Sequence, residues 1–432
     1  MTVPADEPPR AGDLLELTVG EAAHGGWCVA RSGTGAGRVI FVRHALPGER
    51  VRVRITQTTS KFARADAVEV LAAAPGRVEP PCPHARPGGC GGCDWQHASM
   101  PAQRALKAAV ISQQLRRIAG IDRDVVVEPL AGDHDGLGWR TRVRFAVRSD
   151  GIAGLHRHRS HQVAVIGDCP IAHQLVRATG VLQARWHGAK AVEVAVAPES
   201  GEQALIVYGG IIRSESWVDF SADTVLAPGR DGGLTALRGS GFLYQQAAGR
   251  SWRVGAGTFW QVHPGAASAL AEAVLGALRP LPGDVALDLY CGAGLFAGVL
   301  AEAVGPDGVV IGIEHDTAAV RDARHNLRST PWARVHKGDA AAMLARYGVS
   351  GASLAVLDPP RSGAARQVVE LLAAAGSDAG LRRIAYVSCD PATLARDLAI
   401  FGEQGWELEA LRAFDAFPMT HHVECLATIA RW

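Results

Sequence analysis

The sequence predicts an α/β protein in which a small β-barrel and a mostly-β central region precede a doubly wound parallel sheet. Three observations support this class. Short apolar strands alternate with helical segments from about residue 283 onward. The first 75 residues show short alternating stretches broken by glycine-rich turns, and residues 122–253 consist mostly of strand-like segments. A chain of 432 residues usually folds as two or three domains, and we place them at residues 1–75, 76–255 and 256–432.

The composition is that of a globular chain, and we expect it to be cytoplasmic. Hydrophobic residues make up 48% and charged residues 20% of the sequence, which excludes a disordered or fibrous chain. It contains no long apolar run and no basic segment followed by an apolar one, so we expect no membrane partner. Eight cysteines in such a chain indicate metal, cluster or catalytic use rather than a disulfide framework.

The predicted barrel has an apolar inner face and a cationic outer face. In residues 49–57, ERVRVRITQ, Val51, Val53 and Ile55 fall on one side of a strand, and the arginines between them fall on the other. A small barrel with such a face often follows a nucleic-acid backbone. The alternative interpretation is an ordinary polar surface strand.

A connection rich in proline and glycine, residues 75–97, follows the barrel and contains three cysteines. After it, a helix is predicted with Ser99 as its cap, Pro101 in its first turn and Gly120 as its stop. The connection therefore separates two folded regions and presents its cysteines in one tight loop.

Residues 139–162 form a basic patch, with six arginines, three histidines and a single acid, Asp150. The patch predicts either a phosphate-binding surface or a solvated face. In its first strand the arginines share one face and the apolar residues share the other. These residues are Arg140, Arg142, Arg144 and Arg148 on one side and Val143, Phe145 and Val147 on the other. We expect the four arginines to form a cationic wall beside the cysteine loop.

The C-terminal domain is predicted from seven strand-like segments. The first five alternate with helices, which is typical of a parallel sheet. The last two follow each other without a helix, which indicates an antiparallel hairpin at the edge of that sheet. The segments are residues 285–290, 309–314, 334–339, 354–359, 383–389, 406–414 and 421–430.

The first turn of this domain, from Asp288 to Ala297 (DLYCGAGLFA), has the features of a nucleotide-type cofactor site. Gly292 and Gly294 allow a tight turn, and Glu314 ends the next strand, where a carboxylate can accept two ribose hydroxyls. The spacing also fits the dinucleotide fingerprint, so this stretch alone admits NAD, S-adenosylmethionine or a plain turn. The acid ahead of the glycines, the LDPPRSG turn and the antiparallel ending favour S-adenosylmethionine.

Two further side chains are predicted at the same edge of the sheet. Asp358 lies in DPPRSG at the end of the fourth strand and is held by two prolines, although an Asp-Pro turn can simply end a strand. Cys389 ends the fifth strand in YVSCDPATLARDL, and the helix that starts just after it can favour a thiolate. We interpret Cys389 as a nucleophile, and an inert core cysteine is the alternative.

The blocks DLYCGAGLFA, DPPRSG, YVSCDPATLARDL and HHVECL, in this order, resemble the RNA uracil-C5 methyltransferase family. The first 75 residues resemble the small TRAM barrel that many members carry, so the likeness covers most of the chain. The resemblance implies a Rossmann-like catalytic domain, S-adenosylmethionine as cofactor, RNA as substrate and 5-methyluridine as product.

The resemblance also implies roles for single residues. Cys389 would add to C6 of the uracil, and Glu424 on the last strand would remove the C5 proton. A surface glutamate on an edge strand is the alternative for Glu424. The implied cofactor contacts are Gln261, in TFWQVHPGAA, and Tyr290, Glu314, Asp339 and Asp358.

The remaining group consists of Cys82, Cys90, Cys93 and the distant Cys169, which can surround an iron–sulfur cluster or a zinc ion. Family members with this layout hold a 4Fe-4S cluster, so the resemblance implies one here. Zinc and no metal are the alternatives. The seven residues between Cys82 and Cys90 form a longer gap than the family usually has.

Two other functions are compatible with the sequence. One is a cytosine-C5 RNA methyltransferase, but that class places its cysteine after a proline, whereas Ser388 precedes Cys389 here. The other is an RNA-binding protein or chaperone with a silent catalytic domain, which would be expected to lose Cys389 or Glu424. Our prediction is a monomer that acts on rRNA or tRNA without an obligatory protein partner.

Overall fold

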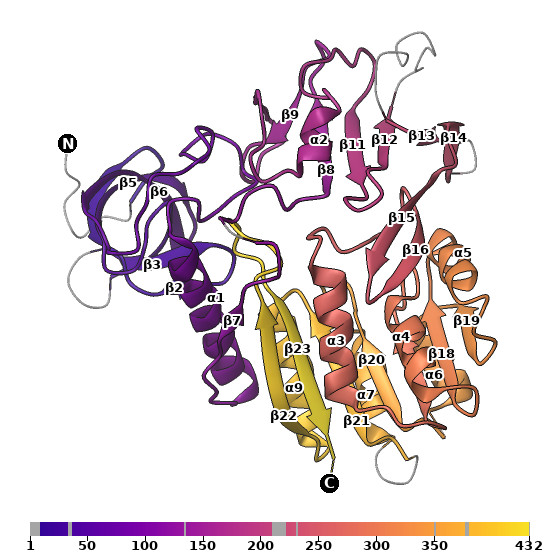
Figure 1. The fold of residues 1–432 in the computed structure, drawn as a ribbon. Helices are drawn as coiled ribbons and strands as arrows, with labels where there is room; N and C mark the ends of the chain where they lie inside the picture. Colours follow the sequence, from indigo (N-terminus) through magenta and orange to yellow (C-terminus); the bar gives the residue numbers. More distant parts are fainter. Residues whose placement is uncertain are drawn as a thin grey trace.

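The computed structural model describes residues 9–32, 37–133, 135–209, 222–229, 232–349, 351–375 and 380–431. These residues form an N-terminal barrel, a central sheet and a C-terminal α/β domain. The three parts lie around a common centre, with the barrel at the left, the central sheet at the top and the α/β domain at the lower right of Figure 1. None of the described helices combines the length and the apolar character that a membrane crossing requires.

The N-terminal barrel is a six-stranded sheet in the order β1-β5-β6-β4-β3-β2. Its strands are β1 (Leu14–Thr18), β2 (Ala22–Ala23), β3 (Trp27–Arg31), β4 (Val39–Arg43), β5 (Arg50–Thr58) and β6 (Phe62–Ala72). The predicted alternation in β5 is confirmed, because its apolar residues are buried and Arg50 and Arg54 are exposed. Arg52 pairs with Glu16 and Glu69 on the two neighbouring strands. Its charge is therefore balanced within the barrel.

One long helix lies between the barrel and the C-terminal domain (Figure 1). It runs as α1 (Met100–Gln114) and continues through a wider turn, η1 (Leu115–Ala119), to the predicted stop at Gly120. Leu106 packs among barrel residues, whereas Ile111 packs among residues of the C-terminal domain. The helix therefore fixes the position of the barrel relative to the C-terminal sheet.

The central domain is a seven-stranded sheet in the order β10-β9-β8-β11-β12-β13-β14. Its strands are β8 (Arg142–Val147), β9 (Ala153–His156), β10 (Val163–Val165), β11 (Ala191–Val196), β12 (Gln203–Tyr208), β13 (Thr224–Pro228) and β14 (Leu234–Arg238), and a short helix, α2 (Gln174–Ala178), follows β10. Apolar residues of β8 and β11 pack with Trp139 and Trp186 to form its core. This sheet carries the basic patch.

Two parts of the segment 76–255 lie on the C-terminal domain. The hairpin of β15 (Phe242–Ala247) and β16 (Arg250–Gly255) buries Trp252 in the core of that domain. The short strand β7 (Val127–Glu128) pairs in parallel with β22, near the C-terminus. The chain thus contributes to the C-terminal sheet before it builds the central one.

The C-terminal sheet has eight strands in the order β19-β18-β17-β20-β21-β23-β22-β7. Its other strands are β17 (Val285–Leu289), β18 (Val309–Glu314), β19 (Ala333–Lys337), β20 (Leu354–Leu357), β21 (Arg383–Ser388), β22 (Glu407–Phe414) and β23 (Glu424–Ala430). Strands β17 to β21 pair in parallel, and β23 runs antiparallel to both β21 and β22. The predicted parallel sheet and its antiparallel ending are confirmed.

Helices cover both faces of this sheet, which explains why strands such as β20 are apolar throughout. One face is covered by α3 (Ala266–Leu278), α4 (Leu295–Val304) and α5 (Thr317–Asn326). The other face is covered by α6 (Ala340–Tyr347), α7 (Arg366–Ala374) and α9 (Pro391–Glu403), together with part of α1. With both faces covered, the open ends of the strands are the place where a ligand can reach the sheet.

Candidate active site

The register of the C-terminal sheet places Cys389 and Glu424 near each other. Ser388, the last residue of β21, pairs with Cys425 of the antiparallel strand β23. The ladder ends at this pair, and Cys389 directly follows it on one chain segment while Glu424, the first residue of β23, directly precedes it on the other, so that the charge of Glu424 acts on the thiol. The parallel strands end and β23 begins at this edge of the sheet, where doubly wound folds bind ligands. The structure thus brings the two predicted catalytic residues together.

The Cys389 side chain is a neutral thiol in the free protein. Burial raises its pKa to about 12, the charge of Glu424 adds to the rise, and Arg361 opposes it. The sequence predicted that the start of α9 would favour the thiolate. That prediction is wrong, because Asp390 caps α9 with its own carboxylate, which accepts hydrogen bonds from two amides of the first turn. The helix start therefore offers these donors to Asp390 and not to the sulfur.

Glu424 shares the site with a second carboxyl group, Asp358, which follows β20. Glu424 is only 3% exposed, and burial together with the charge of Asp358 raises its pKa well above the ordinary value. Burial raises the pKa of Asp358 to about 7. Two carboxyl groups that interact in this way disfavour each other's ionised form. Each member of the pair therefore holds its proton more tightly than an isolated carboxyl group does.

The predicted cofactor loop follows β17 at the same edge. Asp288 is fully buried and accepts a hydrogen bond from the Ala297 amide at 2.7 Å, and burial raises its pKa to about 8. Its Oδ1 atom has no hydrogen-bond partner among the described residues. Glu314 accepts hydrogen bonds from the amides of Gly292 at 3.0 Å and Asp316 at 2.7 Å. Two acidic side chains, one on β17 and one on β18, thus accept hydrogen bonds from the glycine turn and from the helix that follows it.

The other predicted cofactor contacts lie after neighbouring strands. Tyr290 directly follows β17 with a φ of 65°, in the left-handed region, and Asp358 follows β20. Asp339 follows β19 and caps α6 by accepting a hydrogen bond from the Ala342 amide at 2.9 Å. Gln261 is buried in the loop before α3. With Glu314 at the end of β18, four of the five predicted contacts lie at the carboxyl ends of four strands.

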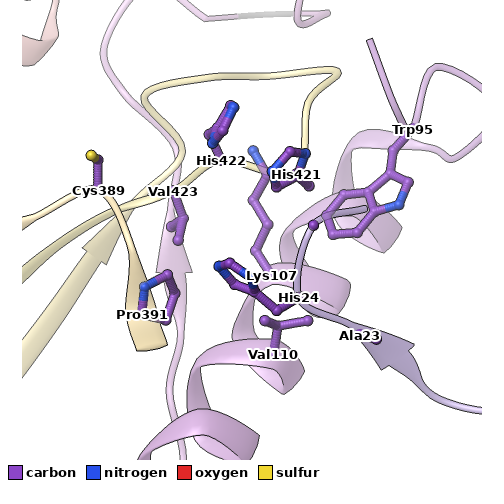
Figure 2. Close-up of a pocket in the computed structure, with 11 residues that line it drawn as sticks. Ala23, His24, Trp95, Lys107, Val110, Cys389, Pro391, His421, His422 and Val423 are labelled. Carbon is purple, nitrogen blue, oxygen red and sulfur yellow. The ribbon is translucent and has the colours of Figure 1, made fainter. Parts of the chain in front are cut away.

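A small pocket, partly open to solvent, lies beside Cys389 where the barrel meets the C-terminal domain (Figure 2). Its lining comes from the barrel, the cysteine loop, α1 and the C-terminal domain. The residues are Ala23, His24, Gly25, Trp95, Lys107, Val110, Cys389, Pro391, His421, His422 and Val423. Reasoning from the sequence missed the three histidines, and the only signal was the HH pair in HHVECL.

Ionic contacts join the parts of the molecule around this pocket. Asp94 accepts a hydrogen bond from His421 Nδ1 at 2.6 Å and pairs with Arg43 of β4 at 3.3 Å. Lys107 of α1 and Asp415 are fully buried and pair at 2.5 Å. The barrel, the cysteine loop and the last strands of the sheet are therefore held together next to Cys389.

Comparisons with known proteins identify the family. The profile of the TRAM domain matches residues 10–68, and that of tRNA (Uracil-5-)-methyltransferase matches residues 340–431. An uncharacterized RNA methyltransferase of Streptomyces avermitilis is 48% identical, over 97% of this chain and 98% of its own. The 23S rRNA (uracil(1939)-C(5))-methyltransferase RlmD of Pseudomonas putida is 33% identical, over 90% and 88%. This chain belongs to the RNA uracil-C5 methyltransferase family.

A solved structure shows the same fold. The Pyrococcus abyssi tRNA (uracil-54, C5)-methyltransferase, in complex with S-adenosyl-L-homocysteine, matches 96% of this methyltransferase and 100% of its own chain with a TM-score of 0.72 at 21% identity. The predicted fold class, with its TRAM barrel and Rossmann-like catalytic domain, is confirmed. The profile of protein-L-isoaspartate(D-aspartate) O-methyltransferase also matches residues 265–344, which include the predicted cofactor loop.

Of the four predicted cluster cysteines of the methyltransferase, Cys90, Cys93 and Cys169 pack in the core of the central domain, and Cys82 acts through its charge on Cys90 and Cys169. Burial and the neighbouring thiols Cys169 and Cys90 raise the pKa of Cys93. Burial raises the pKa of Cys169 to about 11, with Arg140 opposing and Cys90 and Cys82 adding to the rise. In the part of the chain that the structure describes, no three donor side chains are already arranged around a metal position. Four thiols nonetheless form a donor set suited to a soft metal centre.

The cationic wall of the methyltransferase is smaller than the sequence predicted. Arg144 is exposed and lies over the ring of Tyr208 at 4.1 Å. Arg142 is turned into the protein, where it pairs with Glu193 at 3.0 Å and donates to the Thr258 carbonyl at 2.6 Å. The prediction that Arg142 belongs to the wall is therefore wrong, because the loop before α3 covers this part of the face.

Proposed function

We propose that this methyltransferase transfers a methyl group from S-adenosylmethionine to C5 of a uridine in RNA, with Cys389 as nucleophile and Glu424 as general base. The observation that carries the proposal is the antiparallel pairing of β21 and β23, which brings Cys389 and Glu424 together at the ligand-binding edge of the sheet. The Pseudomonas putida relative supports it, because its name assigns it methylation of uracil at C5.

Methylation of uracil at C5 requires a nucleophile that adds to C6 and a base that removes the C5 proton. C5 is too weak a nucleophile to accept a methyl group, whereas addition of the Cys389 thiolate to C6 creates an enolate with carbanion character at C5. S-adenosylmethionine, when bound, supplies the methyl group. Removal of the C5 proton by Glu424 then lets the bond between C6 and sulfur break, and 5-methyluridine is released.

Both groups must lose a proton before they act. Burial raises the pKa of Cys389 to about 12 and that of Glu424 well above its ordinary value. A positively charged ligand at this edge would favour the ionised form of each. Without such a ligand, the surroundings of Cys389 favour its thiol form over the thiolate.

We assign the cofactor to the turn after β17 and to the strand ends beside it. The support is positional, since four of the assigned side chains follow four neighbouring strands. The unpartnered Oδ1 of Asp288 adds a buried acceptor behind the same turn. The assigned residues are Gln261, Tyr290, Glu314, Asp339 and Asp358.

Ribosomal RNA is the substrate we propose. The Pseudomonas putida relative, 33% identical over most of both chains, is named for 23S rRNA, whereas the likeness to the tRNA enzyme of Pyrococcus abyssi is a likeness of fold. The target uridine must leave its stack, at a cost of a few kcal/mol, and base stacking can return about 1–3 kcal/mol per base. Mass-spectrometric mapping of 5-methyluridine in rRNA and tRNA, with and without the gene, identifies the substrate.

Trapping with 5-fluorouridine in the mapped RNA tests the catalytic roles. Once S-adenosylmethionine has supplied the methyl group to C5, the fluorine there cannot be removed as the proton is, so a working nucleophile remains bonded to C6 as an adduct that survives denaturing electrophoresis. We expect this adduct with the wild-type protein and none with Cys389→Ala. A protein that binds the RNA without any adduct would be the silent alternative, and an adduct with 5-fluorocytidine instead would indicate the cytosine enzyme.

We further propose that Cys82, Cys90, Cys93 and Cys169 hold a 4Fe-4S cluster, on the support of four interacting thiols from two separate segments. The methyl transfer needs no electron, so the cluster would organise the RNA-binding region. Protein purified without oxygen should contain about four iron and four sulfide per chain. Cys90→Ser should lower both, while a stoichiometric zinc ion or a metal-free protein would contradict the cluster.

A further inference from the structure

A histidine of the TRAM barrel contacts the residue next to the nucleophile. His24 lies between β2 and β3, and its Nε2 is 2.9 Å from Oδ2 of Asp390. The two residues are 366 positions apart in the sequence. His24 and Cys389 both line the pocket between the barrel and the catalytic domain, and Figure 2 shows His24 beside Pro391, the residue after Asp390.

Asp390 uses its two carboxylate oxygens for two different tasks. Oδ1 accepts the amides of Ala392 and Thr393, each at 3.0 Å, and so caps α9. Oδ2 is left for His24. Since Asp390 is bonded directly to Cys389, one carboxylate links the barrel, the first turn of α9 and the peptide that carries the sulfur. The orientation of the peptide between Cys389 and Asp390 therefore depends on the contact with His24 and on the cap of α9.

We infer that His24 is a positioning residue for the nucleophile, through which the TRAM barrel holds Asp390 and thereby Cys389 in the orientation needed to attack C6. The inference rests on the proposed function, because it requires Cys389 to be the nucleophile. It makes the barrel a structural part of the active site in addition to an RNA-binding module.

The charges of the pair agree with this role. The hydrogen bond and the charge of Asp390 raise the pKa of His24, with burial opposing. Burial alone would raise the pKa of Asp390. Its hydrogen bonds to His24 and to the helix amides outweigh burial and lower this pKa to about 2. Both residues therefore favour their charged forms in mildly acidic solution, and the pair weakens as the pH rises through the raised pKa of His24.

Titratable groups from several neighbouring elements surround His24, and they show which contact a pH profile would report. Asp390 and Cys389 face it from the end of β21, Lys107 from α1, and His421 and His422 from the loop before β23. The ring of His421 is 6.4 Å from that of His24. Asp390 is the only acid of this set, so replacing His24 isolates the contribution of this pair to a pH profile.

A double-mutant cycle tests the inference. His24→Gln removes the charge, and Asp390→Asn keeps a good helix cap while removing its partner charge. The readout is the single-turnover rate of adduct formation with 5-fluorouridine RNA, measured beside RNA affinity. We expect each single variant to be slower by about five- to tenfold with unchanged RNA affinity. The double variant should be no slower than the singles, because they remove the same contact.

The pH dependence separates positioning from a loss of folding. The ratio of wild-type to His24→Gln rates should be largest near pH 6 and approach one at alkaline pH, where His24 is neutral. The control is Glu21→Gln near the same turn, which disturbs a different contact, that of Glu21 with Gln113 of α1 at 3.3 Å. This control should match the wild type at every pH.

Each outcome decides between the two proposals. Equal rates for wild type and His24→Gln, or additive losses in the double variant, would overturn the role of His24 while leaving the proposed function intact. Absence of any adduct with the wild-type protein would instead contradict the role of Cys389. A ratio that does not change with pH would show that His24 acts without its charge and would also overturn the inference.

Discussion

Glu424 illustrates how the sheet decides the role of a residue. A glutamate on the last strand could equally be a surface residue of an edge strand. In the structure β23 lies between β21 and β22, so Glu424 is inside the sheet and 3% exposed. A carboxyl group buried beside Asp358 and Cys389 costs stability, which is the expected signature of a functional group rather than of a structural one.

We expect Glu424→Gln to bind RNA and to form the bond to C6 but to release product slowly. Glutamine has nearly the same shape and cannot accept the C5 proton, so the covalent intermediate should accumulate on ordinary uridine RNA. Turnover should fall by about 100- to 10,000-fold, the range of a lost general base. Steady-state rates and denaturing gels measure these two quantities. Normal turnover, or an absent adduct, would contradict the role of Glu424 as the base.

Local motifs singled out Cys389 and Glu424 as the candidate pair, but they could not predict the surroundings of these residues. Cys389 and Glu424 each lie in a short sequence motif, and the strand beside each residue can be predicted from the sequence. The contact of His24 with Asp390 joins positions 366 residues apart and exists only because the barrel is docked on the catalytic domain. The direction of the Cys389 pKa was missed for the same reason, since burial and the charge of Glu424 come from other strands.

At the scale of the element, β8 shows what strand alternation can predict. A period of two correctly assigns Arg142 and Arg144 to one face. It does not say what covers that face, and here the loop before α3 covers Arg142 and leaves Arg144 open. Similarly, β7 was not predicted because it is two residues long and depends on the free edge of β22.

Arg144→Ala should weaken RNA binding and make it less dependent on salt. Arg144 is exposed on β8, and stacking on Tyr208 orders its guanidinium for a phosphate or base. Loss of one phosphate contact should reduce the slope of log affinity against log salt by about one. Binding titrations at several salt concentrations measure the slope. An unchanged slope would exclude Arg144 from the RNA surface.

Arg142→Ala is the matched control on the same strand and face. It should destabilise folding by about 2 kcal/mol, because it removes charge-assisted hydrogen bonds and leaves Glu193 without its cationic partner. The salt slope of RNA binding should stay that of the wild type. Urea unfolding and the same titrations separate the two effects. A reduced salt slope of RNA binding would show that Arg142 belongs to the cationic wall.

At the scale of the whole molecule, the candidate active site lies where three parts of the chain meet. Asp94 of the cysteine loop contacts Arg43 of the barrel and His421 of the catalytic domain. The pocket beside Cys389 is lined from the barrel, the cysteine loop, α1 and the last strands. The sequence predicted the three parts from their patterns, but these contacts depend on how the parts dock, which no local pattern encodes. The predicted cytoplasmic monomer stays a prediction.

The buried pair of Lys107 and Asp415 is the strongest candidate for holding this junction together. Lys107 donates to Asp415 at 2.5 Å and to the Phe417 carbonyl at 3.0 Å, and both charged side chains are fully buried. Burial lowers the pKa of Lys107, and the charge of Asp415 opposes that change. A charge in such a place is tolerated only with its partner.

Lys107→Met should therefore destabilise the protein by about 3–5 kcal/mol, because it leaves the Asp415 carboxylate buried without a cation. The double variant Lys107→Met with Asp415→Leu should recover much of this loss, since it buries no unpaired charge. Urea unfolding followed by tryptophan fluorescence measures both, with Arg52→Met in the exposed pairs of the barrel as a control that should change little. A double variant as unstable as Lys107→Met would show that the packing of the lysine side chain, and not its charge, joins the barrel helix to the catalytic sheet.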